Sequence, residues 1–154
     1  MPTVRNWWGE ISYATEDIIT FPRGIIGFEG VKQYILIPLG ETPFRILQAV
    51  DGSGLAFVVV DPNSFVEGYE LALANDEEGA AIYCIVTVPN DPAQMTANLR
   101  APLVIDLVRR QGRQEILEEA YPLRFPLRKP VTSPVEVAAG DGGDLEDKEV
   151  GASA

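Results

Sequence analysis

Residues 86–102 read VTVPNDPAQMTANLRAP, a run in which a strand, a helical turn and a second strand follow one another. The β-branched residues before Pro89 favour a strand, and Pro89 ends it because proline has no N–H for a ladder. Asp91 is suited to cap a helix, Pro92 to be its first residue, and Gln94 to complete an Asp variant of the capping box. The sequence therefore predicts a short helix that starts at Pro92.

The end of this helix is predicted from two residues. Asn98 tolerates the left-handed conformation that ends helices, and Pro102 biases the residue before it toward an extended backbone. We therefore expect the helix to end near Leu99. Two roles are open for the polar face of this turn, contact with a partner or capping of the turn itself. The residues concerned are Gln94, Met95, Thr96 and Asn98.

The rest of the chain reads as short strands between turn residues. Strands are expected at 4–13, 17–21, 33–39, 44–50, 55–60, 69–73, 80–88, 103–109 and 113–117. Residues 110–112 are expected to form a hairpin turn in which Gly112 takes a positive φ. Such a pattern is typical of an all-β sandwich or barrel. We predict a small antiparallel β-barrel-like domain with one short helix after Asp91, since a chain this short must hide its strand edges.

Composition bounds the partners and the domain organisation. The 154 residues carry a net charge of -11, which disfavours nucleic acid and anionic membranes as direct ligands and favours a basic protein. Residues 1–128 are expected to form the barrel domain, and residues 129–154 an acidic, disordered tail. This tail is either simply solvated or screens a basic strip. The strip comprises Arg109, Arg110, Arg113 and Arg124.

Several classes of site are disfavoured by what the sequence lacks. It has no apolar run of the length a spanning helix needs and no signal-peptide pattern at its start, so we expect a cytoplasmic protein. The chain has no His and a single Cys, Cys84, so we expect no cofactor and no metal site. Cys84 stands in an apolar strand, fits a reducing compartment and is expected to pack there.

Two carboxylates offer the best alternative to a binding protein. Asp61 and Asp91 each follow a strand and precede a proline, so they could do acid and base work in a small-ligand-binding barrel or a hydrolase. Asp-Pro after a strand is more often a turn or helix cap, and we weigh that interpretation more heavily.

Aromatic residues mark two further segments. In residues 24–30, GIIGFEG, we expect Phe28 to be buried as a plug, with exposure as an anchor as the alternative. Phe65 and Tyr69 stand close in sequence to Asp61, Asn63 and Glu70 and are suited either to protein recognition or to core packing.

Several blocks together resemble the FliW family of flagellar assembly factors. The resemblance covers about residues 4–127, and its most specific piece is Met-Thr-Ala-Asn-Leu at 95–99. Residues 70–81 are shorter than the helix-containing segment that the family usually carries there. The other matching blocks are 8–11, 19–29, 55–62, 85–89, 101–102, 112–114 and 121–124.

This resemblance implies a non-enzymatic regulator with a compact β-barrel-like fold. Members of the family bind CsrA, a basic RNA-binding repressor of flagellin mRNA, and they bind flagellin as a competing partner or client. An acidic composition agrees with a basic partner. The expected contact residues, assigned by exposure and charge, are Phe28, Glu29, Asp61, Asn63, Glu70, Asp91, Met95, Thr96 and Asn98.

Overall fold

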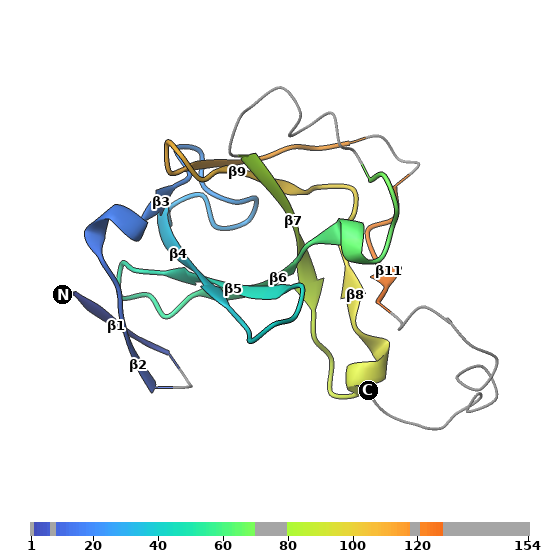
Figure 1. Cartoon of the computed structure of the whole chain (residues 1–154), viewed down its shortest axis with the longest axis horizontal. Helices are drawn as coiled ribbons and strands as arrows, with labels where there is room; N and C mark the ends of the chain where they lie inside the picture. The colour runs from blue at the N-terminus through green and yellow to red at the C-terminus, as the bar shows by residue number, and fades with distance from the viewer. Residues whose placement is uncertain (1, 7–8, 70–79, 118–120, 128–154) are drawn as a thin grey trace.

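The computed structural model describes residues 2–6, 9–69, 80–117 and 121–127 and shows an all-β protein (Figure 1). Its strands are β1 (Thr3–Asn6), β2 (Gly9–Ser12), β3 (Ile19–Thr20), β4 (Gln33–Pro38), β5 (Phe44–Ala49), β6 (Ala56–Val60), β7 (Ala80–Thr87), β8 (Thr96–Ala97), β9 (Leu103–Asp106), β10 (Gln111–Gln114) and β11 (Phe125–Pro126). Three single-turn 3₁₀ helices connect them, namely η1 (Thr15–Asp17), η2 (Pro62–Ser64) and η3 (Pro92–Gln94). The described residues thus have the predicted fold class, with η3 as the predicted helix after Asp91.

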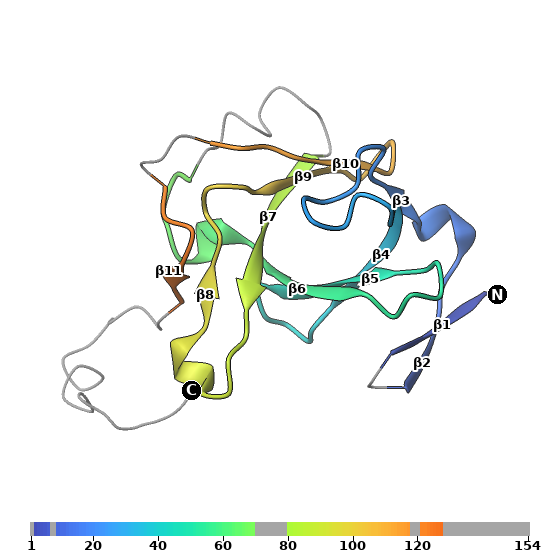
Figure 2. The ribbon, with the colours of Figure 1, turned by 180° about the vertical axis from the view of Figure 1, so that it is seen from behind.

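A closed barrel of seven strands forms the centre of the molecule. Its strands follow the order β7-β6-β5-β4-β3-β10-β9, and β9 pairs with β7 to close the ring. All of these pairings are antiparallel except β3 with β10, which meet in parallel at Thr20 and Gln111. Figures 1 and 2 show the ring from both sides, with the β1–β2 hairpin standing to one side of it. Closure pairs the strand edges around the ring, as expected for a chain this short, except where β10 continues past the end of β3.

Strand β7 is apolar on both faces because it separates two hydrophobic cores. Tyr83 and Ile85 face the barrel interior, where they join residues such as Phe21, Tyr34 and Leu103. The alternate residues face outward, since side chains along a strand point to opposite sides in turn. Ile82, Cys84 and Val86 build a second core.

The second core lies between the barrel wall and the short β8–β11 ladder. Tyr69, Ala97, Leu99 and Leu127 are buried in it. Cys84 is fully buried in this core and packs there as expected, and this burial raises the pKa of its thiol to about 12. Tyr69, the one described residue of the strand expected at 69–73, is buried too, and the core-packing alternative for it is confirmed.

Several predicted elements differ from the observed ones. The single strand expected at 4–13 is the β1–β2 hairpin, with Asn6 paired to Gly9. Gly9 has a φ of +130°, a value that favours glycine, and the chain folds back there. The helix expected to reach Leu99 is only one turn long, because β8 begins two residues after η3 ends.

The hairpin turn between β9 and β10 occupies residues 107–110, earlier than the predicted 110–112. Asp106 Oδ1 accepts the backbone N–H groups of Val108 and Arg109, each at 2.9 Å, and this Asx-type turn reverses the chain. Arg110 takes the positive φ of 58°. Gly112 instead lies within β10, where a Cβ atom would come within 2.4 Å of the Phe21 ring. The glycine is required by close packing and not by turn geometry.

Candidate functional site

The loop at residues 22–30 is a compact turn whose shape depends on Gly24. This glycine has a φ of +69°, and a Cβ atom there would lie 2.6 Å from the Glu29 Cα atom. An isolated bridge joins Ile25 to Phe28. The Gly27 N–H donates to Glu29 Oε2 at 3.0 Å, and this hydrogen bond lowers the pKa of the Glu29 carboxyl. Contacts among its own residues therefore stabilise the shape of the loop.

Phe28 is not the buried plug that was predicted. Its side chain is 43% exposed, while Ile25 is 1% exposed and fills the barrel interior in its place. The Phe28 ring packs edge to face against Phe57, with 5.3 Å between centroids. The bridge between residues 25 and 28 explains the difference, because it turns Ile25 inward and leaves Phe28 at the rim. The structure therefore shows Phe28 in the exposed position of the alternative expectation.

The segment between β8 and β9 bulges away from β7 and is held by Asn98. Asn98 Oδ1 accepts the N–H groups of Arg100 at 3.0 Å and Ala101 at 3.1 Å. Its own N–H donates to the Ile85 carbonyl at 2.9 Å. Among the described residues only Arg110 and glycines take a positive φ, so Asn98 does not adopt the expected left-handed conformation. It caps the bulge with its side chain.

The carboxylates of Asp61 and Asp91 act as helix caps. Asp61 Oδ1 accepts the Asn63 N–H, and Asp91 Oδ1 accepts the Ala93 N–H, both at 3.0 Å. Asp61 follows the end of β6, which pairs with Cys84, whereas Asp91 lies beyond the far end of β7. Figures 1 and 2 show the two single turns, green and yellow, well apart. The proposed acid–base pair is therefore not assembled, and the cap interpretation is confirmed.

Gln114 connects the loop at residues 22–30 to the bulge at 98–102. Its Oε1 atom accepts the Ile26 N–H at 2.9 Å, and its Nε2 atom donates to the Ala101 carbonyl at 3.0 Å. Ile26 and Ala101 are 75 residues apart in sequence, so nothing local predicts that one side chain bonds to both. Gln114 sets the position of the loop against the barrel wall.

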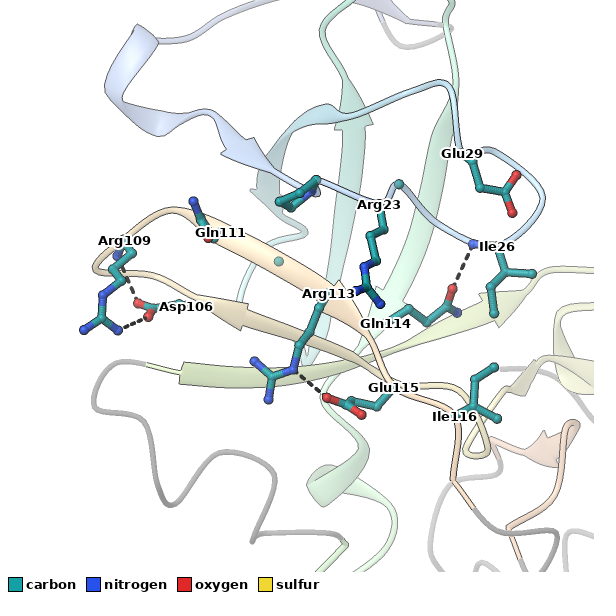
Figure 3. A pocket seen from close by; sticks show the side chains of 13 residues that line it. Arg23, Ile26, Glu29, Asp106, Arg109, Gln111, Arg113, Gln114, Glu115 and Ile116 are labelled. Atoms are coloured by element: carbon teal, nitrogen blue, oxygen red, sulfur yellow. Dashed lines mark hydrogen bonds and ion pairs between the residues drawn. The ribbon is translucent and has the colours of Figure 1, made fainter.

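A groove of about 690 Å³ lies between this loop and β10. Figure 3 shows Ile26 and Ile116 near one end and the pair of Arg109 and Asp106 at the other. The Arg109–Asp106 contact measures 3.0 Å, and Arg113 Nε lies 2.6 Å from Glu115 Oε2. The backbone N–H groups of the turn, the Arg109 N–H first, lower the pKa of Asp106. The groove therefore carries compensated charge beside exposed apolar side chains.

The predicted contact residues fall into three separate regions. Phe28 and Glu29 lie on the loop beside the groove, and Asp61 and Asn63 lie on or next to η2. The third region is η3 with the strand and bulge after it, where Met95 packs on the second core and Thr96 is half-buried. Glu70 lies outside the described residues. No single surface collects the whole set.

Sequence reasoning missed Arg23, Ile26 and Ile116 as surface features. Ile26 is 54% exposed and Ile116 69% exposed. Each stands in a mixed segment with no periodic pattern, so exposure was not predictable from the sequence. The contact between Gln114 and Ile26 could not be predicted from the sequence either, because the two residues are 88 positions apart.

Most of the net negative charge of the chain belongs to residues outside the described ranges. The described residues carry 9 basic and 11 acidic side chains, a net charge of -2, whereas the others carry 3 basic and 12 acidic, a net charge of -9. Within the described ranges, no group of His, Cys, Asp and Glu is arranged to hold a metal ion. The helices of those ranges are far too short to cross a bilayer.

Comparison with known proteins gives a consistent result. The family model described as FliW protein matches residues 3–127. Proteins named flagellar assembly factor FliW match from Caldicellulosiruptor saccharolyticus, at 35% identity over 76% of this chain and 84% of the relative, and from Geobacillus thermodenitrificans, at 39% over 76% and 88%. The relative from Alkaliphilus metalliredigens is 42% identical over 72% of this chain and 75% of its own length.

A solved structure supports the same assignment. The crystal structure of the flagellar assembly factor FliW superimposes with a TM-score of 0.74 at 36% identity. The match covers 84% of this chain and 99% of that one. The Met-Thr-Ala-Asn-Leu block, the glycine-rich loop and Gln114 are also the segments that hold one another in place here. This chain belongs to the FliW family of flagellar assembly factors.

Proposed function

We propose that this protein is a cytoplasmic, non-enzymatic regulator that binds the translational repressor CsrA and so relieves repression of flagellin mRNA. It also binds flagellin, which competes for it. Membership of the family over residues 3–127 is the observation that carries this proposal. The concentration of acidic residues in 70–79, 118–120 and 128–154, with a net charge of -9, supports a basic partner.

In this proposal the acidic segments of the chain act through electrostatics. Opposite net charge speeds association of the acidic segments with basic CsrA, and the same charge repels RNA from the complex. The nine contact residues expected from the sequence remain proposals here. Phe28, Asn63 and Asp91 are exposed and available for contact, whereas Asn98 is engaged in capping the bulge.

The proposal is tested by RNA release. CsrA from the same organism is bound to labelled flagellin leader mRNA, and the full chain is added at about 150 mM salt. We expect the free RNA to increase with added protein, and purified flagellin to reverse the effect. The protein alone should not shift the RNA. RNA that stays bound to CsrA at a large excess of the protein contradicts the proposal.

A further inference from the structure

Strand β10 has one backbone edge with no strand beside it. The Glu115 N–H donates to the Pro102 carbonyl at 3.0 Å and the Leu117 N–H to the Arg100 carbonyl at 2.7 Å. Arg113 is in register with Val104. Because hydrogen-bonding groups alternate along a strand, odd-numbered residues bond on the β9 side, and Gly112, Gln114 and Ile116 direct theirs to the other side.

The opposite side of β10 is occupied by β3 only at its start. The Thr20 N–H donates to the Arg110 carbonyl at 3.0 Å, which shows that even-numbered residues face β3. Strand β3 then ends at Thr20, and Pro22 has no N–H to continue the ladder. Within the described ranges, the Gly112 carbonyl and both backbone groups of Gln114 and Ile116 have no hydrogen-bond partner. These groups line the groove.

The walls of the groove add apolar and cationic chemistry to this edge. Ile26 and Ile116 expose more than half of their side chains. Arg23 makes no ion pair with any described residue, and Figure 3 shows its side chain directed toward β10 beside Gln114. Three acidic residues line the groove. Asp106 and Glu115 are paired to arginines, and Glu29 accepts the Gly27 N–H. An unpaired strand edge is a template for another chain.

We propose that this groove docks an extended segment of a protein partner as an additional strand on β10. An apolar side chain of the segment packs against Ile26 and Ile116, and a carboxylate pairs with Arg23. The groove volume of about 690 Å³ lies in the range of ordinary ligand sites. Main-chain hydrogen bonds supply affinity in such strand addition, and the side-chain contacts supply specificity.

This inference rests on the proposed function and identifies which partner uses the groove. A basic repressor is disfavoured there, because the three arginines of the lining balance its three carboxylates and leave no net negative charge to attract a basic partner. The groove is therefore assigned to a flagellin segment that carries a carboxylate. CsrA then binds at another surface. Competition between CsrA and flagellin arises either from coupling between the two sites or from steric overlap of the bound partners.

Two variants of the full chain, each of which places a negative charge in the groove, test this site. Ile116→Asp and Arg23→Glu should each weaken binding of purified flagellin about tenfold or more, as expected for central contacts of an interface. CsrA binding should change less than twofold. Val108→Asp and Arg124→Glu are the matched controls, since Val108 is 73% exposed, Arg124 is exposed, and both lie outside the groove. The controls should bind both partners as the parent chain does.

Amide exchange measured residue by residue reports the added strand directly. Exchange at Gln114 and Ile116 should slow at least tenfold in the flagellin complex, whereas the Arg113 amide, which already faces β9, should change little. Flagellin binding with unchanged exchange at both amides overturns the proposal, as does unchanged affinity of both groove variants. Equal loss of CsrA binding overturns the assignment to flagellin. If the parent chain binds neither partner, the proposed function itself is wrong.

Discussion

Gly24 is the residue on which the groove loop depends most. Its φ of +69° and the 2.6 Å approach that a Cβ atom would make to Glu29 act together, and the atoms in the way are backbone. Gly27 also has a positive φ, of +90°, but nothing lies within 4 Å of its Cβ direction. Alanine substitutions at these two glycines therefore distinguish the cost of steric collision, expected only at residue 24, from the cost of backbone strain, expected at both.

Gly24→Ala should destabilise the fold more than Gly27→Ala. The left-handed conformation costs an alanine about 1–2 kcal/mol at either position, and displacement of the Glu29 backbone adds to this only at residue 24. We expect a loss of about 2–4 kcal/mol for Gly24→Ala and about 1–2 kcal/mol for the control. Urea unfolding measures both, and equal losses would show that the close approach to Glu29 does not matter.

Asp106 should make the stability of the protein depend on pH in the acid range. Its pKa is lowered in the folded state by the Arg109 N–H and other donors of the turn, so its stabilisation is complete above the unfolded value of about 3.9. It is lost as the pH falls through the lower folded pKa. Asp106→Asn should therefore lower the melting temperature at pH 7, and the difference from the parent chain should shrink below about pH 4. A difference that is the same at pH 7 and pH 3 would contradict this role.

At the scale of elements, the capping chemistry was predictable and the long-range contacts were not. Asp91 and Asp61 each cap a turn through bonds to a residue two positions on, and residue types alone indicate such caps. Strands β4 to β7 lie within two residues of their predicted bounds, because each has a strong apolar run. The β1–β2 hairpin was missed because its reversal has no Asn-Gly or Asp-Gly signal. Tyr69 bonds to the Leu99 carbonyl 30 residues away, which no local pattern reveals.

Gln114 is the element-scale contact that is easiest to test. Gln114→Ala removes the partners of the Ile26 N–H and the Ala101 carbonyl, so the loop at residues 22–30 should loosen. We expect a loss of about 1–3 kcal/mol, the cost of leaving such groups without partners, and faster amide exchange at Ile26. Gln114→Glu keeps an acceptor for Ile26 but loses the donor to Ala101. It should therefore protect the Ile26 amide while still losing stability, and faster exchange in both variants would argue against this bond.

At the scale of the whole molecule, charge and fold are carried by different parts of the chain. The described residues have a net charge of -2 and supply the barrel, and the others contribute a net charge of -9. The family resemblance could be recognised from the sequence because it is carried by contiguous motifs, and several of these motifs contact one another in the structure. The groove could not be predicted from the sequence, because it depends on where β3 ends beside β10 in the folded chain.

This separation predicts different salt dependences for the two partners. Affinity for CsrA should fall steeply as salt rises from about 50 to 500 mM, because many exposed charges are screened over that range. Affinity for flagellin should fall less, since the charges of the groove lining sum to zero and apolar and main-chain contacts dominate there. Fluorescence titrations at several salt concentrations measure both affinities. An equal dependence of the two affinities on salt would contradict the assignment of CsrA to the acidic segments and of flagellin to the groove.

The most direct measurement is a calorimetric titration of the full chain with CsrA, with flagellin, and with CsrA after saturation by flagellin. We predict saturable binding of each partner alone at about 150 mM salt and a clearly weaker affinity for CsrA once flagellin is bound. Binding of neither partner at protein concentrations of tens of micromolar would contradict the proposed function.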